Sequence, residues 1–210
     1  MLELKPMLIR RIVVGPLETN CYIVADSSRK GVIIDPGADD QLILDEASQF
    51  DIKMILLTHG HADHISALKK VKEVTRAPFA IHSLDVSLLG PNGLNYVINP
   101  NFSPLPPPDK LLVDNDEINI GELIIKALHT PGHSPGSLCF LINNVLFSGD
   151  ILFYLGIGRT DLGGDFSMLI SSIKDKLMIL ADDIKVYPGH GPTTTVGTER
   201  RGNPFLSSII

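Results

Sequence analysis

Short apolar runs separated by turn residues dominate the first part of the chain. Residues 7–15 (MLIRRIVVG) and 19–26 (TNCYIVAD) are rich in branched side chains, and only PLE stands between them. These two runs predict a β-hairpin. Residues 31–37 (GVIIDPG) predict a third strand that ends at a Pro-Gly turn.

Apolar residues recur at helical spacing in two segments that alternate with strands. Residues 39–50 (DDQLILDEASQF) predict a helix, and residues 52–60 (IKMILLTHG) return to a strand. Residues 62–74 (ADHISALKKVKEV) predict a second helix, which begins inside a histidine cluster. A short strand over residues 77–82 (APFAIH) follows, so the order is typical of βα units.

The second half repeats this order. Residues 122–150 predict three strands broken by turns, and residues 165–180 predict an amphipathic helix with Asp165 as its N-cap. Residues 184–190 (IKVYPGH) predict a last short strand. Hairpins and βα units in both halves predict a single α/β domain over residues 1–210, in which packed sheets are covered by helices.

Pro, Gly and Asn are concentrated in residues 90–110 (GPNGLNYVINPNFSPLPPPDK). This composition predicts an irregular surface excursion. Two alternatives are a polyproline ligand for a partner, formed by PLPPPD at residues 104–109, and a lid beside an active site.

The overall composition is that of a protein with ample material for a core. Of the 210 residues 44% are hydrophobic, while 24 acidic and 18 basic residues give a net charge of −6, which disfavours broad binding to nucleic-acid phosphates. No apolar run reaches the roughly 18 residues of a membrane span. Charged residues interrupt the N-terminal apolar stretch, unlike a signal peptide. We therefore expect a cytoplasmic protein that binds neither nucleic acid nor membranes.

The two cysteines, Cys21 and Cys139, lie far apart in sequence and form no CxxC pair. This spacing does not indicate a zinc-thiolate site. Free cysteine is among the most often buried residue types, so we expect two buried, inert thiols.

Histidine and aspartate side chains follow four of the predicted strands. The segments are ILLTHGHADH, ALHTPGH, VLFSGD and VYPGH, and in each an apolar run ends in a turn that carries His or Asp. Ligands at the ends of several strands can converge on one rim of a sheet, where rigid elements hold them. The candidate metal ligands are His59, His61, Asp63, His64, His133, Asp150 and His190.

These residue types suit a hard or borderline divalent cation, because imidazoles and carboxylates bind zinc, iron and manganese. Seven ligands exceed the four of a tetrahedral ion and fit two ions that share a carboxylate. The alternative is a set of hydrogen-bonded core histidines, which would require several polar rings at strand ends to find separate partners. We therefore expect two divalent metal ions, with zinc preferred and iron or manganese as the alternatives.

Three residues near these motifs have two interpretations each, and a fourth, His82, has one. Asp35 and Thr58 can orient ligand imidazoles, because metal-bound histidines usually donate their other N–H to a partner. Otherwise they are a turn cap and an ordinary strand residue. His129 stands four residues before His133 and can compete as a ligand, whereas His82 has no motif around it and is expected to be structural.

The order of the motifs is specific to one family. THGHADH resembles the HxHxDH signature of the metallo-β-lactamase superfamily, and TPGHSPGS, SGD and YPGHGP resemble its remaining metal motifs in the same order. The resemblance covers nearly the whole chain and implies an αββα sandwich with the metals at one edge. It selects His133 over His129 as a ligand. It implies one metal held by His59, His61 and His133, another held by Asp63, His64 and His190, and Asp150 bridging them.

Within the superfamily, GIGRTDLGGD and TERRGNPFL are most similar to the single-domain glyoxalase II-like hydrolases, which cleave thioesters such as hydroxyacyl-glutathione. The similarity implies that a metal-bound hydroxide, oriented by Asp63 and Asp150, attacks a small-molecule thioester or ester. Arg159 stands where related hydrolases place a basic residue facing the substrate, so we expect it to bind a substrate carboxylate. A surface ion pair is the alternative for Arg159, and a homo-oligomer is compatible with all these features.

Two other activities of the same fold stay open. An iron-dependent persulfide dioxygenase resembles this chain in HADHI and GRTD, and would use one iron held by residues corresponding to His59, His133 and Asp150. A lactone hydrolase would direct the same hydroxide at an ester carbonyl. Sulfur-substrate turnover that needs oxygen and iron would select the dioxygenase, and a panel of thioesters and lactones would separate the two hydrolases.

Overall fold

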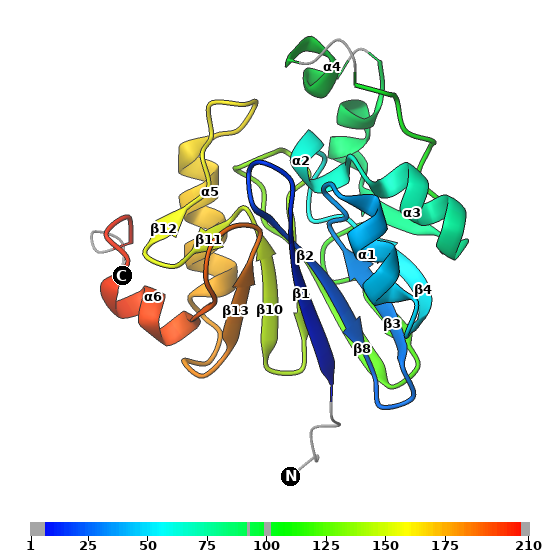
Figure 1. Ribbon diagram of the computed structural model, residues 1–210. Coiled ribbons are helices and arrows are strands. Elements are labelled where there is room, and N and C mark those ends of the chain that lie inside the picture. The colour runs from blue at the N-terminus through cyan, green and yellow to red at the C-terminus, as the bar shows by residue number, and fades with distance from the viewer. Residues whose placement is uncertain (1–6, 92, 99–101, 207–210) are drawn as a thin grey trace.

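Two six-stranded sheets form the centre of the computed structural model, which describes residues 7–91, 93–98 and 102–206 (Figure 1). The strands of the first sheet, in spatial order, are β1 (Leu8–Val14), β2 (Thr19–Ala25), β3 (Lys30–Ile34), β4 (Asp51–Leu56), β5 (Phe79–His82) and β6 (Lys110–Leu112). Those of the second are β14 (Thr194–Thr195), β13 (Lys185–Pro188), β10 (Val145–Gly149), β9 (Leu138–Ile142), β8 (Leu123–His129) and β7 (Glu117–Ile120). A two-stranded sheet pairs β11 (Leu152–Phe153) with β12 (Gly156–Ile157).

The pairing follows the connections predicted from the sequence. β1, β2 and β3 are antiparallel neighbours, as the predicted hairpin requires. β3, β4, β5 and β6 are parallel, because helical segments return the chain between them. β10 and β13 are also parallel, whereas β9 runs antiparallel to both of its neighbours, β8 and β10.

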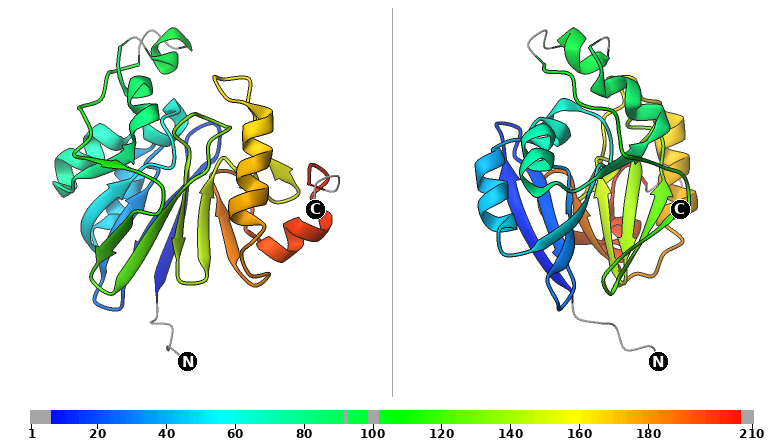
Figure 2. Two further views of the ribbon diagram at one scale, coloured as in Figure 1. Left: turned by 180° about the vertical axis from the view of Figure 1, so that it is seen from behind. Right: turned by 90° about the vertical axis from the view of Figure 1, so that its right-hand side faces the viewer.

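Helices cover the outer face of each sheet (Figures 1 and 2). α1 (Asp40–Ala47) and α3 (Leu68–Thr75) pack on the first sheet, and a cluster of buried residues joins them to β2, β3 and β4. α5 (Phe166–Ser172), the following single turn η2 (Ile173–Leu177) and α6 (Val196–Gly202) pack on the second sheet. The architecture is the predicted αββα sandwich in a single domain.

The alternation of side chains along β2 shows why this strand is apolar on both faces. Cys21 and Ile23 point into the cluster beneath α1 and α3, whereas Tyr22 and Val24 point between the sheets. There Tyr22 meets Phe147 of β10 with ring centroids 5.1 Å apart. Successive side chains of a strand lie on opposite faces, so a central strand of a sandwich must be apolar throughout.

The helix predicted over residues 62–74 is interrupted. α2 (Ala62–Ile65) ends after one turn, and α3 begins at Leu68. The N–H of Ser66 donates to Gly37 O at 3.1 Å as well as to Ala62 O, and the N–H of Ala67 donates to Pro36 O at 3.0 Å. The Pro-Gly turn after β3 therefore competes for the hydrogen bonds that a continuous helix would use.

Three other segments also differ from the prediction in detail. The helix predicted over residues 165–180 continues after α5 as a π-type turn, while Asp165 is the N-cap as predicted, because its side chain accepts from Met168 N at 2.7 Å. β14 and α6 follow the strand predicted to be the last. Residues 90–110 contain a short helix, α4 (Leu94–Ile98), and β6 begins at the last of these residues, so the excursion is not wholly irregular.

The proline-rich part of this excursion is attached to the domain. Phe102 is buried, Leu105 packs against the cluster beneath α1 and α3, and Leu105 N donates to Leu89 O at 3.0 Å. Residues 92 and 99–101 lie outside the described residues. Within the described part of the chain, no helix has the length and apolar character needed to cross a bilayer.

Candidate metal centre

The predicted ligands lie on four loops at one edge of the sandwich. β8, β10 and β13 all point their carboxyl ends to this edge, because β10 is parallel to β13 and β9 is antiparallel to both β8 and β10. The loop after β4 reaches the same place from the other sheet. Backbone hydrogen bonds of 2.7 Å, from Leu138 N to Thr58 O and from Asn20 N to Gly189 O, join the two sheets there.

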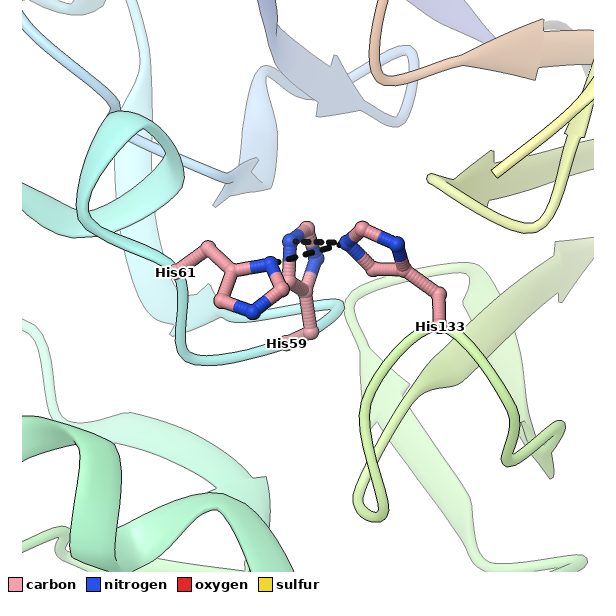
Figure 3. Close-up of side chains that lie close together, drawn as sticks. All are labelled: His59, His61 and His133. Carbon is pink, nitrogen blue, oxygen red and sulfur yellow. Dashed lines mark hydrogen bonds between the residues drawn. The ribbon is translucent and has the colours of Figure 1, made fainter. Parts of the chain in front are cut away.

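Three histidines meet at the first half of this site. His61 and His133 point toward one another from different loops, with the ring of His59 beside them (Figure 3). His61 Nδ1 lies 2.8 Å from His133 Nε2, which lies 3.2 Å from His59 Nε2. Two ligand atoms on a tetrahedral zinc ion are separated by roughly 3.3 Å, given metal–nitrogen distances of about 2.0–2.1 Å. The two separations lie within about 0.5 Å of that value, and one nitrogen from each ring lies within 4.8 Å of the others, so the three rings can share one ion.

Hydrogen bonds at the outer ring nitrogens fix the tautomers. His133 Nδ1 lies 2.7 Å from Arg159 O, and His190 Nδ1 lies 2.9 Å from Leu17 O. A carbonyl oxygen can only accept, so each Nδ1 must carry the proton. In the neutral imidazole, Nε2 then presents a lone pair to the centre of the site.

His59 is oriented through a two-residue relay. Asp35 accepts from Thr58 N at 2.7 Å and from Thr58 Oγ1 at 2.5 Å. The Thr58 hydroxyl has thereby donated its only proton, so it accepts from His59 Nδ1 at 3.0 Å. Asp35 Oδ2 also accepts from His64 Nδ1 at 2.9 Å. The orienting roles expected for Asp35 and Thr58 match these contacts.

Asp63, His64 and His190 form the second half of the site. His190 Nε2 lies 3.2 Å from Asp63 Oδ2 and 3.3 Å from His64 Nε2. Asp150 reaches both halves, since its carboxylate oxygens lie 3.3 Å from His64 Nε2 and 3.7 Å from His133 Nε2. All seven residues singled out in the sequence are thus brought together.

The charge distribution fits cations at both positions. Burial, with the neighbouring His133, lowers the pKa of His61 from 6.5 to about 4, and burial likewise lowers the pKa of His59, so both rings are neutral near pH 7. Burial would raise the pKa of Asp150, but the charge of His64 outweighs it and lowers that pKa. Asp150 Oδ1 is buried, and within the described residues nothing forms a hydrogen bond with it. Lone pairs that converge on a buried, ionised carboxylate need positive charge beside them, either a metal ion or a protonated histidine.

The pKa of His64 also indicates that this part of the site needs positive charge. Burial lowers its pKa, yet Asp150 and Asp35 together outweigh burial and raise it well above 6.5. Without a cation, a proton on His64 is what balances the two carboxylates. A metal ion would displace that proton, because a ligating imidazole must be neutral.

A cavity of about 600 Å³ opens onto this cluster. Its walls combine an apolar side, formed by Leu17, Phe153, Ile157 and Leu162, with the candidate ligands and Arg159. The Arg159 guanidinium donates two hydrogen bonds of 2.6 Å to Asp161, and both side chains are largely exposed. The surface ion pair considered for Arg159 is therefore present, at the rim of the cavity.

The remaining histidines lie apart from the cluster. His129 ends β8 and stacks on His82 with ring centroids 3.9 Å apart, and His82 Nδ1 accepts from Leu84 N at the start of η1 (Ser83–Leu89). Neither belongs to the groups of potential metal ligands found among the described residues. Cys21 and Cys139 are free and buried, as expected.

Sequence reasoning missed several residues of the site. Outside the histidine motifs, Leu17 lines the cavity from the turn before β2, Phe153 from β11 and Asn95 from α4. Asp85, in η1, contacts two of the ligand loops. Of these residues only Asp85 could have been found from the sequence. In HSLD it is an acidic residue that stands just after the strand predicted over residues 77–82.

Comparison with known proteins agrees with this geometry. A family model described as the metallo-β-lactamase superfamily matches residues 14–191. Hydroxyacylglutathione hydrolase GloC from Haemophilus influenzae is 36% identical over 96% of this chain and 99% of that protein. Among solved structures, BLEG-1 B3 metallo-β-lactamase has a TM-score of 0.89 and 38% identity, covering 95% of this chain and all of that one. TTHA1623, in a di-iron-bound form, has a TM-score of 0.82 and 36% identity, covering 94% of this chain and all of that one.

The chain therefore belongs to the metallo-β-lactamase superfamily. Its fold and its His/Asp cluster define a metal-dependent hydrolase of that superfamily.

Proposed function

We propose that this protein hydrolyses small-molecule thioesters of the hydroxyacyl-glutathione type, as a soluble cytoplasmic enzyme with two divalent metal ions, zinc by preference. The observation that carries the proposal is the convergence of two three-residue groups on either side of Asp150. The similarity to GloC over nearly the whole chain supports the thioester. The net charge of −6 supports a small-molecule substrate rather than a nucleic acid.

One cation would be held by His59, His61 and His133, and the other by Asp63, His64 and His190, with Asp150 shared between them. When bound, such ions supply Lewis acidity and lower the pKa of water from 15.7 to about 7, which makes hydroxide available at neutral pH. The preference for zinc follows from the abundance of imidazole ligands and their tetrahedral spacing.

The chain's own residues orient the reactants. Asp63 and Asp150 present ionised oxygens at the floor of the cavity, where they accept hydrogen bonds from the attacking water and fix its position. Leu17, Phe153 and Ile157 provide an apolar wall for the aliphatic parts of the substrate. Arg159 at the rim provides a cation for a substrate carboxylate. A thiolate leaves readily, so the site needs no strong general acid.

The test combines metal analysis with a substrate panel. Protein purified without added metal is analysed for bound elements and assayed against hydroxyacyl-glutathione thioesters, simple thioesters and lactones. We expect about two metal ions per chain and the highest kcat/KM on a thioester, with both lost after chelation. Uniformly higher turnover of lactones would identify a lactone, and not a thioester, as the substrate class. Full activity in a protein without bound metal would overturn the proposal.

A second candidate is an iron-dependent oxygenase acting on sulfur substrates such as persulfides. The similarity to ETHE1 from Myxococcus xanthus, a persulfide dioxygenase, at 29% identity and a TM-score of 0.76 favours this activity, and the di-iron-bound form of TTHA1623 supports iron as the metal. The same preparation distinguishes the two, since hydrolysis proceeds without oxygen. Turnover of a persulfide that stops under anaerobic conditions and requires iron would select the oxygenase.

A further inference from the structure

Asp85 is a fully buried carboxylate that contacts two of the ligand loops. It lies in η1, outside all the histidine motifs, and is 0% exposed. Its Oδ2 accepts from Gly60 N at 2.9 Å and from Ser134 Oγ at 2.7 Å, and its Oδ1 accepts from Gly136 N at 2.6 Å. Both oxygens are thus occupied by groups from the loops that follow β4 and β8.

The contacted groups are the chain neighbours of the first three ligands. Gly60 stands between His59 and His61, and Ser134 directly follows His133. Asp85 therefore joins the loop that carries two histidines to the loop that carries the third.

Gly60 and Gly136 leave space for Asp85 and the η1 backbone to approach the two loops closely. A Cβ on Gly136 would lie 2.6 Å from Asp85 Oδ1 and 2.7 Å from its Cγ. A Cβ on Gly60 would lie 2.9 Å from Leu88 Cβ and 3.1 Å from Asp85 O. Metal ligation by itself places no demand on these two positions, so the close approach of η1 explains why neither carries a side chain.

Asn95 of α4 holds the same loop from another direction. Its Nδ2 donates to Gly60 O at 2.7 Å, and its Oδ1 accepts from Ala62 N at 3.0 Å. The backbone on both sides of His61 is consequently fixed by side chains from residues 85–95.

We propose that Asp85 is a positioning residue of the metal centre: it clamps the His59/His61 loop to the His133 loop, and so sets the geometry of the first ion's three imidazoles. The inference rests on the metal centre of the proposed function. It adds a residue, from a segment that carries no metal ligand, on which that centre's affinity depends.

The substitution Asp85→Asn tests the clamp with almost no change in shape. An amide offers one acceptor oxygen and one NH₂ group, whereas the carboxylate accepts at both oxygens. The NH₂ must face a backbone N–H, from either Gly60 or Gly136, and neither can rotate away. In either orientation the amide loses one backbone hydrogen bond of the clamp and sets two donors against each other, so the hold on one loop is weakened. Residues that orient metal ligands typically contribute 10–100-fold to metal affinity.

Asp26 offers a matched control. It is also a buried carboxylate, and it accepts from Ser28 N, Lys30 N and Glu122 N at 2.8–3.0 Å and from Ser28 Oγ at 2.7 Å. Asp26 also joins two loops, but it lies at the other end of the sheet. It directly follows the last residue of β2, whereas Thr19, the first residue of β2, contacts Asp63 of the metal centre. Asp26→Asn loses comparable hydrogen bonds far from the metal centre.

The experiment measures metal binding directly. The full chain and both variants are stripped with a chelator, checked for folding by circular dichroism and titrated with Zn²⁺ against a chromophoric chelator. The visible absorption of the Co²⁺-loaded forms reports ligand geometry. We expect Asp85→Asn to weaken the first ion by about 10–100-fold and to alter the cobalt spectrum, and Asp26→Asn to change neither. Equal affinity and spectrum in Asp85→Asn and the wild type, or an equal loss in Asp26→Asn, would overturn the proposal.

A milder variant covers the case in which Asp85→Asn does not fold. Ser134→Ala removes one donor to Asp85 without a clash, and we expect a smaller loss of affinity in the same assay; an unchanged affinity in the folded Ser134→Ala protein would overturn the clamp. Failure of the wild type to bind metal would instead overturn the proposed function, so the two failures are distinguishable.

Discussion

The imidazole of His133 and the backbone of Arg159 are joined by a 2.7 Å hydrogen bond from Nδ1–H to the carbonyl oxygen. Arg159 thus orients a candidate metal ligand with its main chain while its guanidinium lies at the cavity rim. The main-chain contact survives any side-chain substitution except one that moves the backbone. Ligand orientation and substrate recognition at this residue can therefore be separated by experiment.

Arg159→Ala should raise KM for carboxylate-bearing thioesters without loss of metal. A hydrogen bond to a charged group contributes about 1.5–3 kcal/mol, so we expect KM to rise about tenfold or more. The pair with Asp161 is solvent-exposed and contributes little to stability. Steady-state kinetics on matched thioesters with and without a carboxylate provide the measurement. An equal change on both substrates would remove Arg159 from substrate recognition.

His61→Ala and Asp150→Ala should each reduce metal content and hydrolysis together. Each removes a group that faces the converging nitrogens, so we expect activity to fall by more than about 100-fold, beyond the 10–100-fold typical of residues that only orient ligands. Elemental analysis and initial rates provide the measurement. His129→Ala is the matched control, since His129 stacks on His82 away from the cluster. Full metal content in both ligand variants would contradict the assigned ligand set.

Gly189→Ala should disturb the centre although it removes no ligand. A Cβ at this position would lie 2.2 Å from Asp150 Oδ1 and 2.7 Å from His64 Cε1. Asp150 or the loop must therefore shift, and we expect weaker binding of metal. At Gly156, by contrast, the nearest atom to a Cβ is 3.6 Å away, so Gly156→Ala serves as the control. Identical metal affinity in the two variants would contradict the expected clash between a Cβ at position 189 and the Asp150 carboxylate.

The buried thiol of Cys139 should make the fold less stable at alkaline pH. Burial raises its pKa from 9.0 to about 12. Below pH 9 the thiol is protonated in both states; above it only the unfolded chain ionises, which favours unfolding. At pH 10.5 this amounts to about 2 kcal/mol, at about 1.36 kcal/mol per pH unit. Urea unfolding at pH 8 and 10.5 measures the change in the free energy of unfolding between the two pH values. This free energy should fall less in Cys139→Ala than in the wild type, and an equal fall in both would contradict the raised pKa of Cys139.

The pattern of apolar and turn residues was sufficient to predict most of the strands and helices, because these elements depend mainly on interactions between residues close in sequence. The strands around Ile23 and Leu146 are apolar runs bounded by turns, and the Asp165 cap needs only its own helix. The break after Ile65 could not be predicted, because it depends on carbonyls of Pro36 and Gly37 brought there by the fold.

By itself the sequence determined which side chains are available for metal chemistry, since residue type and the position just after a strand are local properties. The tertiary structure alone decided which nitrogen of each ring faces inward, because the partners at the outer nitrogens, Leu17 O and Arg159 O, come from distant segments. It also decided that Asp150 reaches both groups and that Asp85 holds two loops together. Hydrogen bonds and charge act over a few ångströms in space, whatever the separation along the chain, so only folding brings these partners within reach.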